Sequence, residues 1–284
     1  MKTILVPTDF SDNALKAMQY AIRFANTTSS RLVFFRATDT IVPETAPVHL
    51  YHELVKSDIE ENTEELKQQV SKAYALSGIT PAPDSYSLSV EYGAFKNMIH
   101  VAIKNYHVDL IIMGTQGASG LKKVFFGSNT ASLFTQVDIP VLAVPADAST
   151  DTTITKIGYA SDLTDFGDEL AKVVAFAKPF NAAIELFHVY PVYPQLVDVN
   201  KFDKEKVLKT LIAKFDYSNL HITFIQTEYD NDIIAGIEQY VTQEKPSLLV
   251  MFTHERSWFD KLFNPSISQS VAFGTKTPLL VFKK

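Results

Sequence analysis

Short apolar runs alternate with longer stretches of helical periodicity along the first half of the chain. The apolar runs are rich in Val, Ile, Leu and Phe and lie at residues 3–8, 31–37, 85–91, 108–113 and 140–144. Runs of this length, bounded by Pro, Gly or Asp, are typical of strands. Most of them lack a clean alternation of apolar and polar positions, which favours a sheet covered on both faces.

Segments with helical periodicity lie between these runs. Ser11 or Asp12 can cap the first segment. The second segment extends from Tyr51 to about Ser77, and Gly78 is well placed to end it. Its apolar stripe comprises Leu54, Val55, Ile59, Leu66, Val70 and Ala73. The spacing of this stripe predicts an amphipathic helix with one buried face.

Two further helices are expected at residues 95–106 and 127–135. Strand and helix then alternate until a fifth strand closes the half, and this order implies a parallel, doubly wound α/β sheet. The second half repeats the order from Lys156 to Phe282. The predicted fold class is therefore α/β, with two tandem five-stranded, doubly wound, Rossmann-like domains.

The two halves are also related in sequence. Residues 113–144 align without a gap with residues 251–282, a shift of 138 positions. The segments that open the halves, ILVPTDFS and IGYASDLT, resemble each other as well. Similarity at both ends, in the same order, indicates a duplication. We place the domains at residues 1–146 and 154–284, joined by a small polar linker.

Composition narrows the possible functions. The chain has no cysteine, which excludes disulfides, thiolate metal sites and a cysteine nucleophile, and we expect a cytoplasmic setting. The net charge is −6 and no long basic cluster is present, so nucleic-acid binding is not expected. No apolar run approaches the length of a membrane span or of a signal segment, so neither is expected.

Candidate chemistry follows the fourth strand, where the sequence reads GTQGASGLKKVFFGSNTASLF. Ligands of open parallel sheets bind beyond the carboxyl ends of the strands. Two residues separate Gly114 from Gly117, nine separate Gly117 from Gly127, and Ser128 follows. Glycine allows close approach of the backbone to a ligand, and free N–H groups at a helix start suit a phosphate. The hydroxyls of Ser128 and Thr130 offer further donors.

This G-x2-G-x9-G-[ST] pattern resembles the nucleotide signature of the universal stress protein family, and the resemblance covers essentially the whole chain. Asp9 matches an aspartate that the family carries at the end of its first strand. The resemblance implies an ATP-class adenine nucleotide (ATP, ADP or AMP), with Mg²⁺ as a candidate companion. The site residues that it implies are Pro7, Thr8, Asp9, Ala37, Met113, Gly114, Gln116, Gly117, Gly127, Ser128, Asn129 and Thr130.

The family's binding mode implies a role for each position. Pro7, Thr8 and Asp9 would lie at the adenosine, with Ala37 beside the base. Met113 and Gly114 would line the floor of the site, and the residues from Gln116 to Thr130 in the set above would surround the phosphates.

Other interpretations of these residues stay open. Gln116 stands where the family often has a basic or imidazole side chain, and Lys122 and Lys123 either supply that charge or form a solvated face. Asp9 also fits a turn or cap, and Ser128 a helix cap. The glycines also fit plain turns.

The second half lacks the phosphate-binding pattern. The alignment places Phe252, Glu255 and Pro265 at the positions of the three glycines. Phenylalanine blocks close approach, glutamate repels phosphate and proline removes a backbone donor. We therefore expect a degenerate copy that does not bind nucleotide. The family pairs through its last strands, here residues 140–144 and 278–282, which implies an internal pseudo-dimer.

The sequence holds no motif of a familiar enzyme. P-loop, G-x-S-x-G and H-E-x-x-H strings are all missing. His49 and His52 share a helical spacing beside Glu53 without a third partner, so no metal site is expected there. Three functions remain: a nucleotide-binding stress or regulatory protein with an unknown protein partner and a possible homodimer, a slow ATPase, and a nucleotide-free interaction scaffold. The intact motif favours the first.

Overall fold

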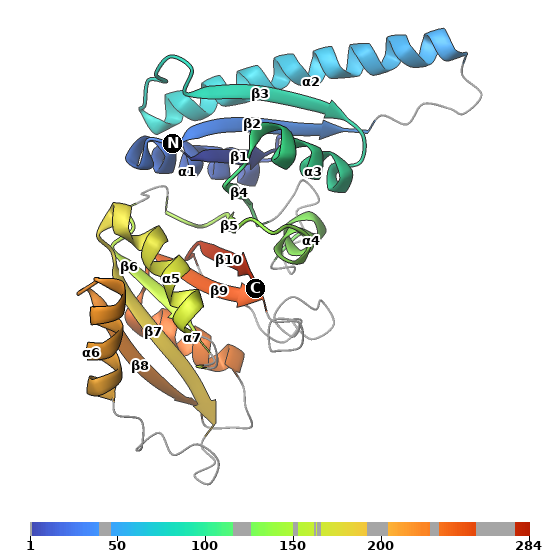
Figure 1. Cartoon of the computed structure of the whole chain (residues 1–284). Helices are drawn as coiled ribbons and strands as arrows, with labels where there is room; N and C mark the ends of the chain where they lie inside the picture. Colours follow the sequence, from blue (N-terminus) through green and yellow to red (C-terminus); the bar gives the residue numbers. More distant parts are fainter. Residues whose placement is uncertain are drawn as a thin grey trace. The chain divides into compact units, whose positions relative to one another are not determined.

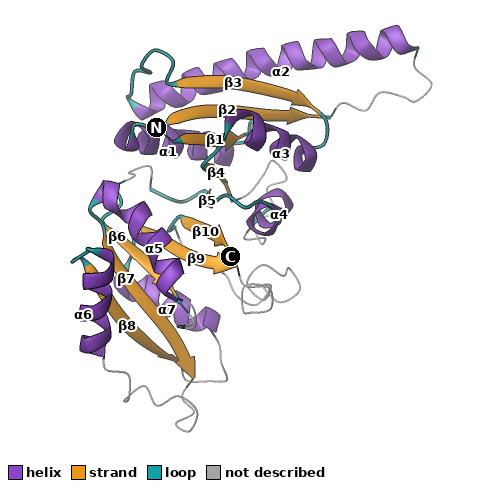
Figure 2. Cartoon of the chain, viewed as in Figure 1, coloured by secondary structure: helices purple, strands orange, loops and turns teal. Residues whose placement is uncertain are grey.

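The computed structural model of the chain describes residues 2–39, 47–115, 126–149, 153–161, 163, 166–191, 204–227, 233–253 and 276–284. The chain divides into two compact units, the first built from Met1–Asp151 and the second from Thr152–Phe282. Each unit is a sheet flanked by helices (Figures 1 and 2). None of the described helices is both long enough and apolar enough to cross a membrane.

The first unit contains a parallel sheet of five strands. The strands are β1 Thr3–Pro7, β2 Arg31–Thr38, β3 Tyr86–Tyr92, β4 Leu110–Gly114 and β5 Val141–Val144. The helices are α1 Asp12–Thr28, α2 Val48–Ser77, α3 Phe95–Tyr106 and α4 Ser128–Gln136. The strand order is β3-β2-β1-β4-β5, and every pairing is parallel. The predicted α/β fold class is confirmed.

The strand order reverses direction between β1 and β4, which lie side by side at the centre of this sheet. The connection after β1 runs to one side of this pair and the connection after β4 runs to the other. Because both connections are right-handed, their helices lie on opposite faces of the sheet. A crevice then forms beyond the carboxyl ends of the two central strands. The turn after β1 and the end of β4 meet at this crevice.

The ends of α1 and α2 follow from local chemistry. The Ser11 side chain accepts a hydrogen bond from the Ala14 backbone N–H at 3.2 Å, so Ser11 is the residue that caps α1. Gly78 ends α2 with φ of 67°, in the left-handed region that glycine tolerates best. Both were predicted from the sequence.

The predicted helix is present as α2, and its apolar stripe is buried along the second half of the helix. Leu66, Val70 and Ala73 are buried, whereas Leu54 is 38% exposed. The helix has 30 residues and is about 45 Å long, whereas the neighbouring β3 has seven residues and spans about 23 Å. The first turns of α2 therefore extend past the sheet (Figure 1).

The second unit repeats this order of elements. Its strands are β6 Lys156–Ala160, β7 Ala183–Pro191, β8 Leu220–Thr227, β9 Leu248–Thr253 and β10 Leu279–Lys283, in the order β10-β9-β6-β7-β8. Its helices are α5 Phe166–Ala177, α6 Lys204–Phe215 and α7 Ile233–Glu244, with a 3-10 turn at Lys178–Phe180. The helix expected between β9 and β10 lies outside the described residues.

A tightly packed tyrosine organises the core of the second unit. The ring of Tyr240 stacks on that of Phe187 with centroids 3.8 Å apart, and its hydroxyl donates to Glu185 at 3.2 Å. Burial and the nearby Glu185 charge raise the pKa of Tyr240 far above its ordinary value. Gly158 faces this ring, and a Cβ atom there would lie 2.5 Å from it. A glycine is therefore required on β6 for Tyr240 to pack.

Candidate functional site

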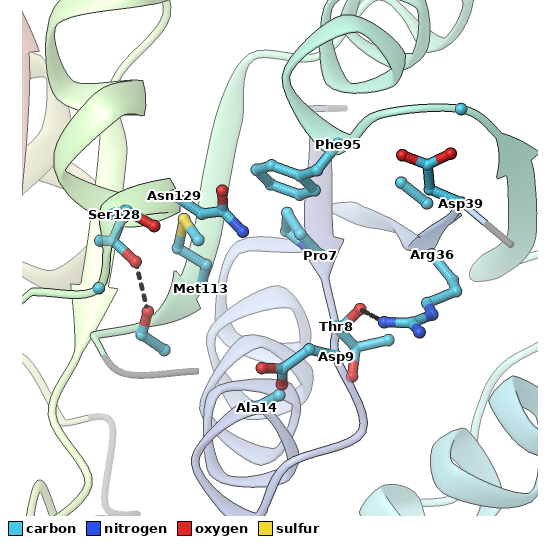
Figure 3. A pocket seen from close by; sticks show the side chains of 15 residues that line it. Pro7, Thr8, Asp9, Ala14, Arg36, Asp39, Phe95, Met113, Ser128 and Asn129 are labelled. Atoms are coloured by element: carbon cyan, nitrogen blue, oxygen red, sulfur yellow. Dashed lines mark hydrogen bonds between the residues drawn. The ribbon is translucent and has the colours of Figure 1, made fainter. Parts of the chain in front are cut away.

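A cavity of about 440 Å³ opens at the carboxyl ends of β1, β2 and β4 in the first unit (Figure 3). Its lining residues are Pro7, Thr8, Asp9, Ala14, Arg36, Ala37, Asp39, Gly93, Phe95, Met113, Gly114, Gly127, Ser128, Asn129 and Thr130. Ten of the twelve residues expected from the sequence are thus brought together. The other two, Gln116 and Gly117, lie outside the described residues, as do Lys122 and Lys123. The volume is in the range of small-molecule sites.

The turn after β1 carries Asp9 to this cavity. The Thr8 backbone N–H donates to the carbonyl of Phe35 on β2 at 2.9 Å, which extends the strand pairing by one residue. Phe10 then adopts φ of 65°, and its N–H donates to the Thr8 hydroxyl at 3.0 Å. Asp9 Oδ1 accepts from the Ser11 backbone N–H at 3.1 Å and from its hydroxyl at 2.6 Å. Asp9 therefore both shapes the turn and lines the cavity.

Part of the cavity wall is apolar, and the sequence analysis missed one of its residues, Phe95. Pro7 and Phe95 lie close together in this wall, with Met113 toward α4 (Figure 3). Phe95 is the first residue of α3 and follows Gly93, whose φ is 140°. The position of Phe95 just after β3 was a usable signal, because every segment that follows a strand of this parallel sheet begins at the same edge.

Arg36 and Asp39 line the cavity from the end of β2 and were also missed (Figure 3). Arg36 is the one charged residue that interrupts the apolar run Leu32–Ala37. A charged residue near the carboxyl end of a buried strand was a second usable signal, since burial of an unpaired charge is costly. Together with Asp9, these residues give the cavity two carboxylates and one guanidinium.

The opposite end of the cavity is the beginning of α4. Gly127 occupies the N-cap position and has no side chain to cap the helix, and Ser128 and Asn129 are exposed in the first turn. Backbone N–H groups at such a start have no partner within the helix. The Gly127 N–H itself donates to the Thr115 carbonyl at 2.6 Å, which joins the two ends of the segment between β4 and α4.

The expected role of the Thr130 hydroxyl is corrected by its contacts. Thr130 is 3% exposed, and its Oγ1 donates to the carbonyl of Gly114 at 2.9 Å. The proton of this hydroxyl is therefore used inside the protein and is not available to a phosphate. Thr130 still lines the cavity, where its role is to attach α4 to β4.

Packing inside the first unit also requires a glycine at position 114. A Cβ atom at Gly114 would lie 2.8 Å from Nδ2 of Asn13 and 3.2 Å from the Asn13 carbonyl oxygen. Real Cβ contacts are longer, so α1 would have to shift away from β4. Close packing of α1 explains Gly114 without any ligand.

In the equivalent region of the second unit, the described residues enclose only a small cavity. This cavity has a volume of about 50 Å³, enough for roughly one or two water molecules at about 30 Å³ each. It is lined by Ala160, Ser161, Phe187, His188, Val189, Ile233 and Ile237. A nucleoside does not fit this space. The alignment of the two halves showed that the second one differs from the first at the phosphate-binding glycines. The described residues at the ends of β6 and β7 show a further difference, at the place where the nucleoside would lie.

Phe252 fills the interior at the position that aligns with Gly114. It is 2% exposed, with its ring stacked 5.1 Å from that of Phe282 and edge-on to Tyr159 at 5.7 Å. The phenylalanine is therefore a core residue of the second unit. Glu255 and Pro265, the other expected departures, lie outside the described residues.

No metal centre is formed in the part of the chain that the structure describes. No three His, Asp or Glu side chains in it are grouped so that they could hold an ion. His49, His52 and Glu53 are all exposed in the first turns of α2.

Comparison with known proteins gives a consistent result for both halves. The model of the family described as "Universal stress protein family" matches residues 1–145 and again residues 153–283. A universal stress protein of Methanocaldococcus jannaschii is 27% identical over 143 residues, which cover 50% of this chain and 81% of that protein. One from Thermus aquaticus is 29% identical over 143 residues, covering 50% of this chain and 98% of that protein.

The solved structures extend the likeness to the complete chain. The crystal structure of a universal stress protein from Archaeoglobus fulgidus covers 99% of this chain and 96% of its own, with a TM-score of 0.69 and 19% identity. At this level of identity the match shows the fold. The fold likeness thus spans both halves, whereas each of the two sequence relatives matches half of the chain.

Proposed function

The chain belongs to the universal stress protein family, with two tandem domains, and from this we propose that it binds an adenine nucleotide of the ATP class in its first domain and acts as a nucleotide-dependent regulatory protein of the stress response. The observation that carries the proposal is the cavity of about 440 Å³ with an acidic acceptor at one end and an uncapped helix start at the other. The second domain offers only about 50 Å³ at the equivalent place.

The nucleoside would occupy the end formed by β1, β2 and α3. Pro7, Phe95 and Met113 offer apolar surface for the base. The Asp9 carboxylate is held in place by Ser11 and can accept hydrogen bonds from ribose hydroxyls. Hydrogen bonds to a charged acceptor are about twice as strong as neutral ones, so Asp9 would contribute strongly to nucleoside affinity.

The phosphates would lie against the beginning of α4. The N–H groups of Ser128 and Asn129 and the positive end of the helix dipole favour an anion there. The Gly127 N–H bonds to the Thr115 carbonyl, which holds this helix start beside the end of β4. We propose that nucleotide binding changes a surface of the first domain that a protein partner recognises. Mg²⁺ would be carried by the nucleotide's own phosphates.

Hydrolysis of the nucleotide is a second candidate that no observation favours. Asp9 and Asp39 are the only carboxylates among the residues that line the cavity. Asp9 already accepts two hydrogen bonds from Ser11 and is assigned to the ribose, at the end away from the phosphates. A general base needs to lie within hydrogen-bond reach of the attacking water. A scaffold without nucleotide remains an alternative, and a cytoplasmic location stays a prediction.

The variant Gly117→Glu tests the proposal, because it copies Glu255 of the second domain. The added carboxylate would repel the phosphates, and we expect calorimetry to show no ATP binding by this variant. Val101→Glu is the matched control, since it adds the same charge at an exposed position on α3. Undiminished ATP binding by Gly117→Glu would contradict the site assignment.

A further inference from the structure

We propose that Arg36 is a positioning residue that fixes the turn carrying Asp9 and thereby sets the affinity of the first domain for the nucleoside part of its ligand. The inference rests on the proposed function and deepens it, since it assigns a role to a residue outside the nucleotide motif. Arg36 lies on β2 and lines the cavity beside Thr8 and Asp9 (Figure 3).

The guanidinium of Arg36 holds the turn after β1 in two ways. Its Nη1 donates to the carbonyl oxygen of Thr8 at 3.4 Å, and its Cζ lies 4.7 Å from the ring centroid of Phe10. Thr8 and Phe10 are the two neighbours of Asp9 in the chain. Phe10 has φ of 65°, a conformation that a phenylalanine adopts only when its surroundings impose it. Arg36 thus contacts the turn on both sides of Asp9, the residue that is proposed to bind the ribose.

The other side of the guanidinium is fixed by α2. Arg36 Nε donates to Asn62 Oδ1 at 3.0 Å. Asn62 Nδ2 in turn donates to the Asp58 backbone carbonyl at 2.9 Å, and the Thr38 hydroxyl donates to the Asp58 carboxylate. The planar, five-donor fork of arginine suits such a bridge between two elements, whereas a point charge such as lysine does not.

The second domain contains the same arrangement with different residues. There the Ser161 N–H donates to the Phe187 carbonyl at 3.0 Å, and Leu163 has φ of 64° with its N–H bonded to the Ser161 hydroxyl at 3.1 Å. The distances in the first domain are 2.9 Å for the strand bond and 3.0 Å for the turn bond. The two turns are therefore built alike.

His188 occupies the place of Arg36 in that second turn. The strand registers pair Pro7 with Phe35 and Ala160 with Phe187, so Arg36 and His188 hold the same position. Nδ1 of His188 donates to the Ser161 carbonyl at 2.8 Å, as Arg36 donates to the Thr8 carbonyl. A side-chain donor at this position thus appears twice in one chain. In the described parts of the two units, the first copy adjoins a cavity of about 440 Å³ and the second copy one of about 50 Å³.

Removal of the donor leads to a specific expectation. Without Arg36 the turn loses two of its contacts, at Thr8 and Phe10, and the backbone that carries Asp9 is held less firmly. Any ligand with a ribose then binds more weakly, by a factor that does not depend on its phosphates. Loss of one hydrogen bond from a charged donor corresponds to roughly tenfold in affinity.

The experiment measures ATP and adenosine binding to the full chain by calorimetry. Arg36→Met, which has no hydrogen-bond donor, is expected to weaken both ligands by the same factor, roughly tenfold. Arg36→His, which copies the second domain, is expected to restore most of the affinity. His188→Met is the matched control: it removes the side-chain donor from the second turn and is expected to leave both affinities unchanged.

A double variant separates positioning from direct contact. If Arg36 acts through Asp9, adding Arg36→Met to Asp9→Ala is expected to cause no further loss, because coupled residues are not additive. Full additivity, equal binding by Arg36→Met and wild type, or loss of ATP affinity without loss of adenosine affinity would each overturn the inference. Failure of the wild-type chain to bind either ligand would instead overturn the proposed function itself.

Discussion

The buried hydroxyl of Thr130 donates a hydrogen bond to the carbonyl oxygen of Gly114 at 2.9 Å. This bond joins the first turn of α4 to the carboxyl end of β4. The bond therefore holds Gly114, the first glycine of the motif, beside the helix start that carries Ser128 and Asn129.

The bond makes Thr130→Val a test of this role. The substitution keeps the shape of the side chain and leaves the Gly114 carbonyl without its donor, so we expect the free energy of unfolding to fall by about 1–3 kcal/mol. We also expect weaker ATP binding, because α4 is no longer fixed to β4. Urea denaturation and calorimetry measure the two effects. Thr130→Ser keeps the hydroxyl and is the control; equal losses in both variants would show that packing, not the bond, matters.

The two ends of the cavity are expected to respond to different ligands. Asp9→Ala removes the proposed ribose acceptor and should weaken ATP and adenosine alike, by roughly tenfold for a charged hydrogen bond. Ser128→Ala removes an exposed hydroxyl at the start of α4 and should weaken ATP a few-fold while leaving adenosine unchanged. Titration of each variant with both ligands measures this split. A loss of adenosine affinity in Ser128→Ala would show that the nucleoside lies at α4, which contradicts the proposed orientation of the nucleotide.

Much of the fold could be predicted because it depends on local pattern. The apolar runs gave the strands, and the capping chemistry of Ser11 and Gly78 gave the ends of two helices. The exposed first turns of α2 could not be predicted, because the length of the sheet beside a helix is set by other parts of the chain. Leu54 has the right spacing for burial but is 38% exposed.

The candidate site was predictable only where a motif marked it. The contacts of Arg36 with Thr8 and Asn62 join residues 28 and 26 positions apart, and no local pattern shows them. The same holds for the bond from Thr130 and for the close approach of Asn13 to Gly114. These features arise from the juxtaposition of elements, which the sequence alone does not display.

The packing of Tyr240 against β6 leads to a stability prediction in the second domain. Gly158→Ala would place a Cβ atom 2.5 Å from the Tyr240 ring, and we expect it to lower the free energy of unfolding by about 1–3 kcal/mol. Gly167→Ala is the matched control, since a Cβ atom there would meet only Lys214 Nζ at 3.4 Å. That change in α5 should be neutral or slightly stabilising. Equal thermal unfolding temperatures for the two variants would contradict the packing argument.

The stoichiometry of ATP binding to the full chain tests the central claim most directly. Isothermal titration calorimetry with and without Mg²⁺ gives both the number of sites and the affinity. The proposal predicts about one site per chain, located in the first domain, because the described residues at the equivalent place in the second domain enclose only a small cavity. Two sites would contradict the assignment of the second domain as a degenerate copy. No binding of ATP, ADP or AMP at millimolar concentration would contradict nucleotide binding altogether and favour a nucleotide-free scaffold.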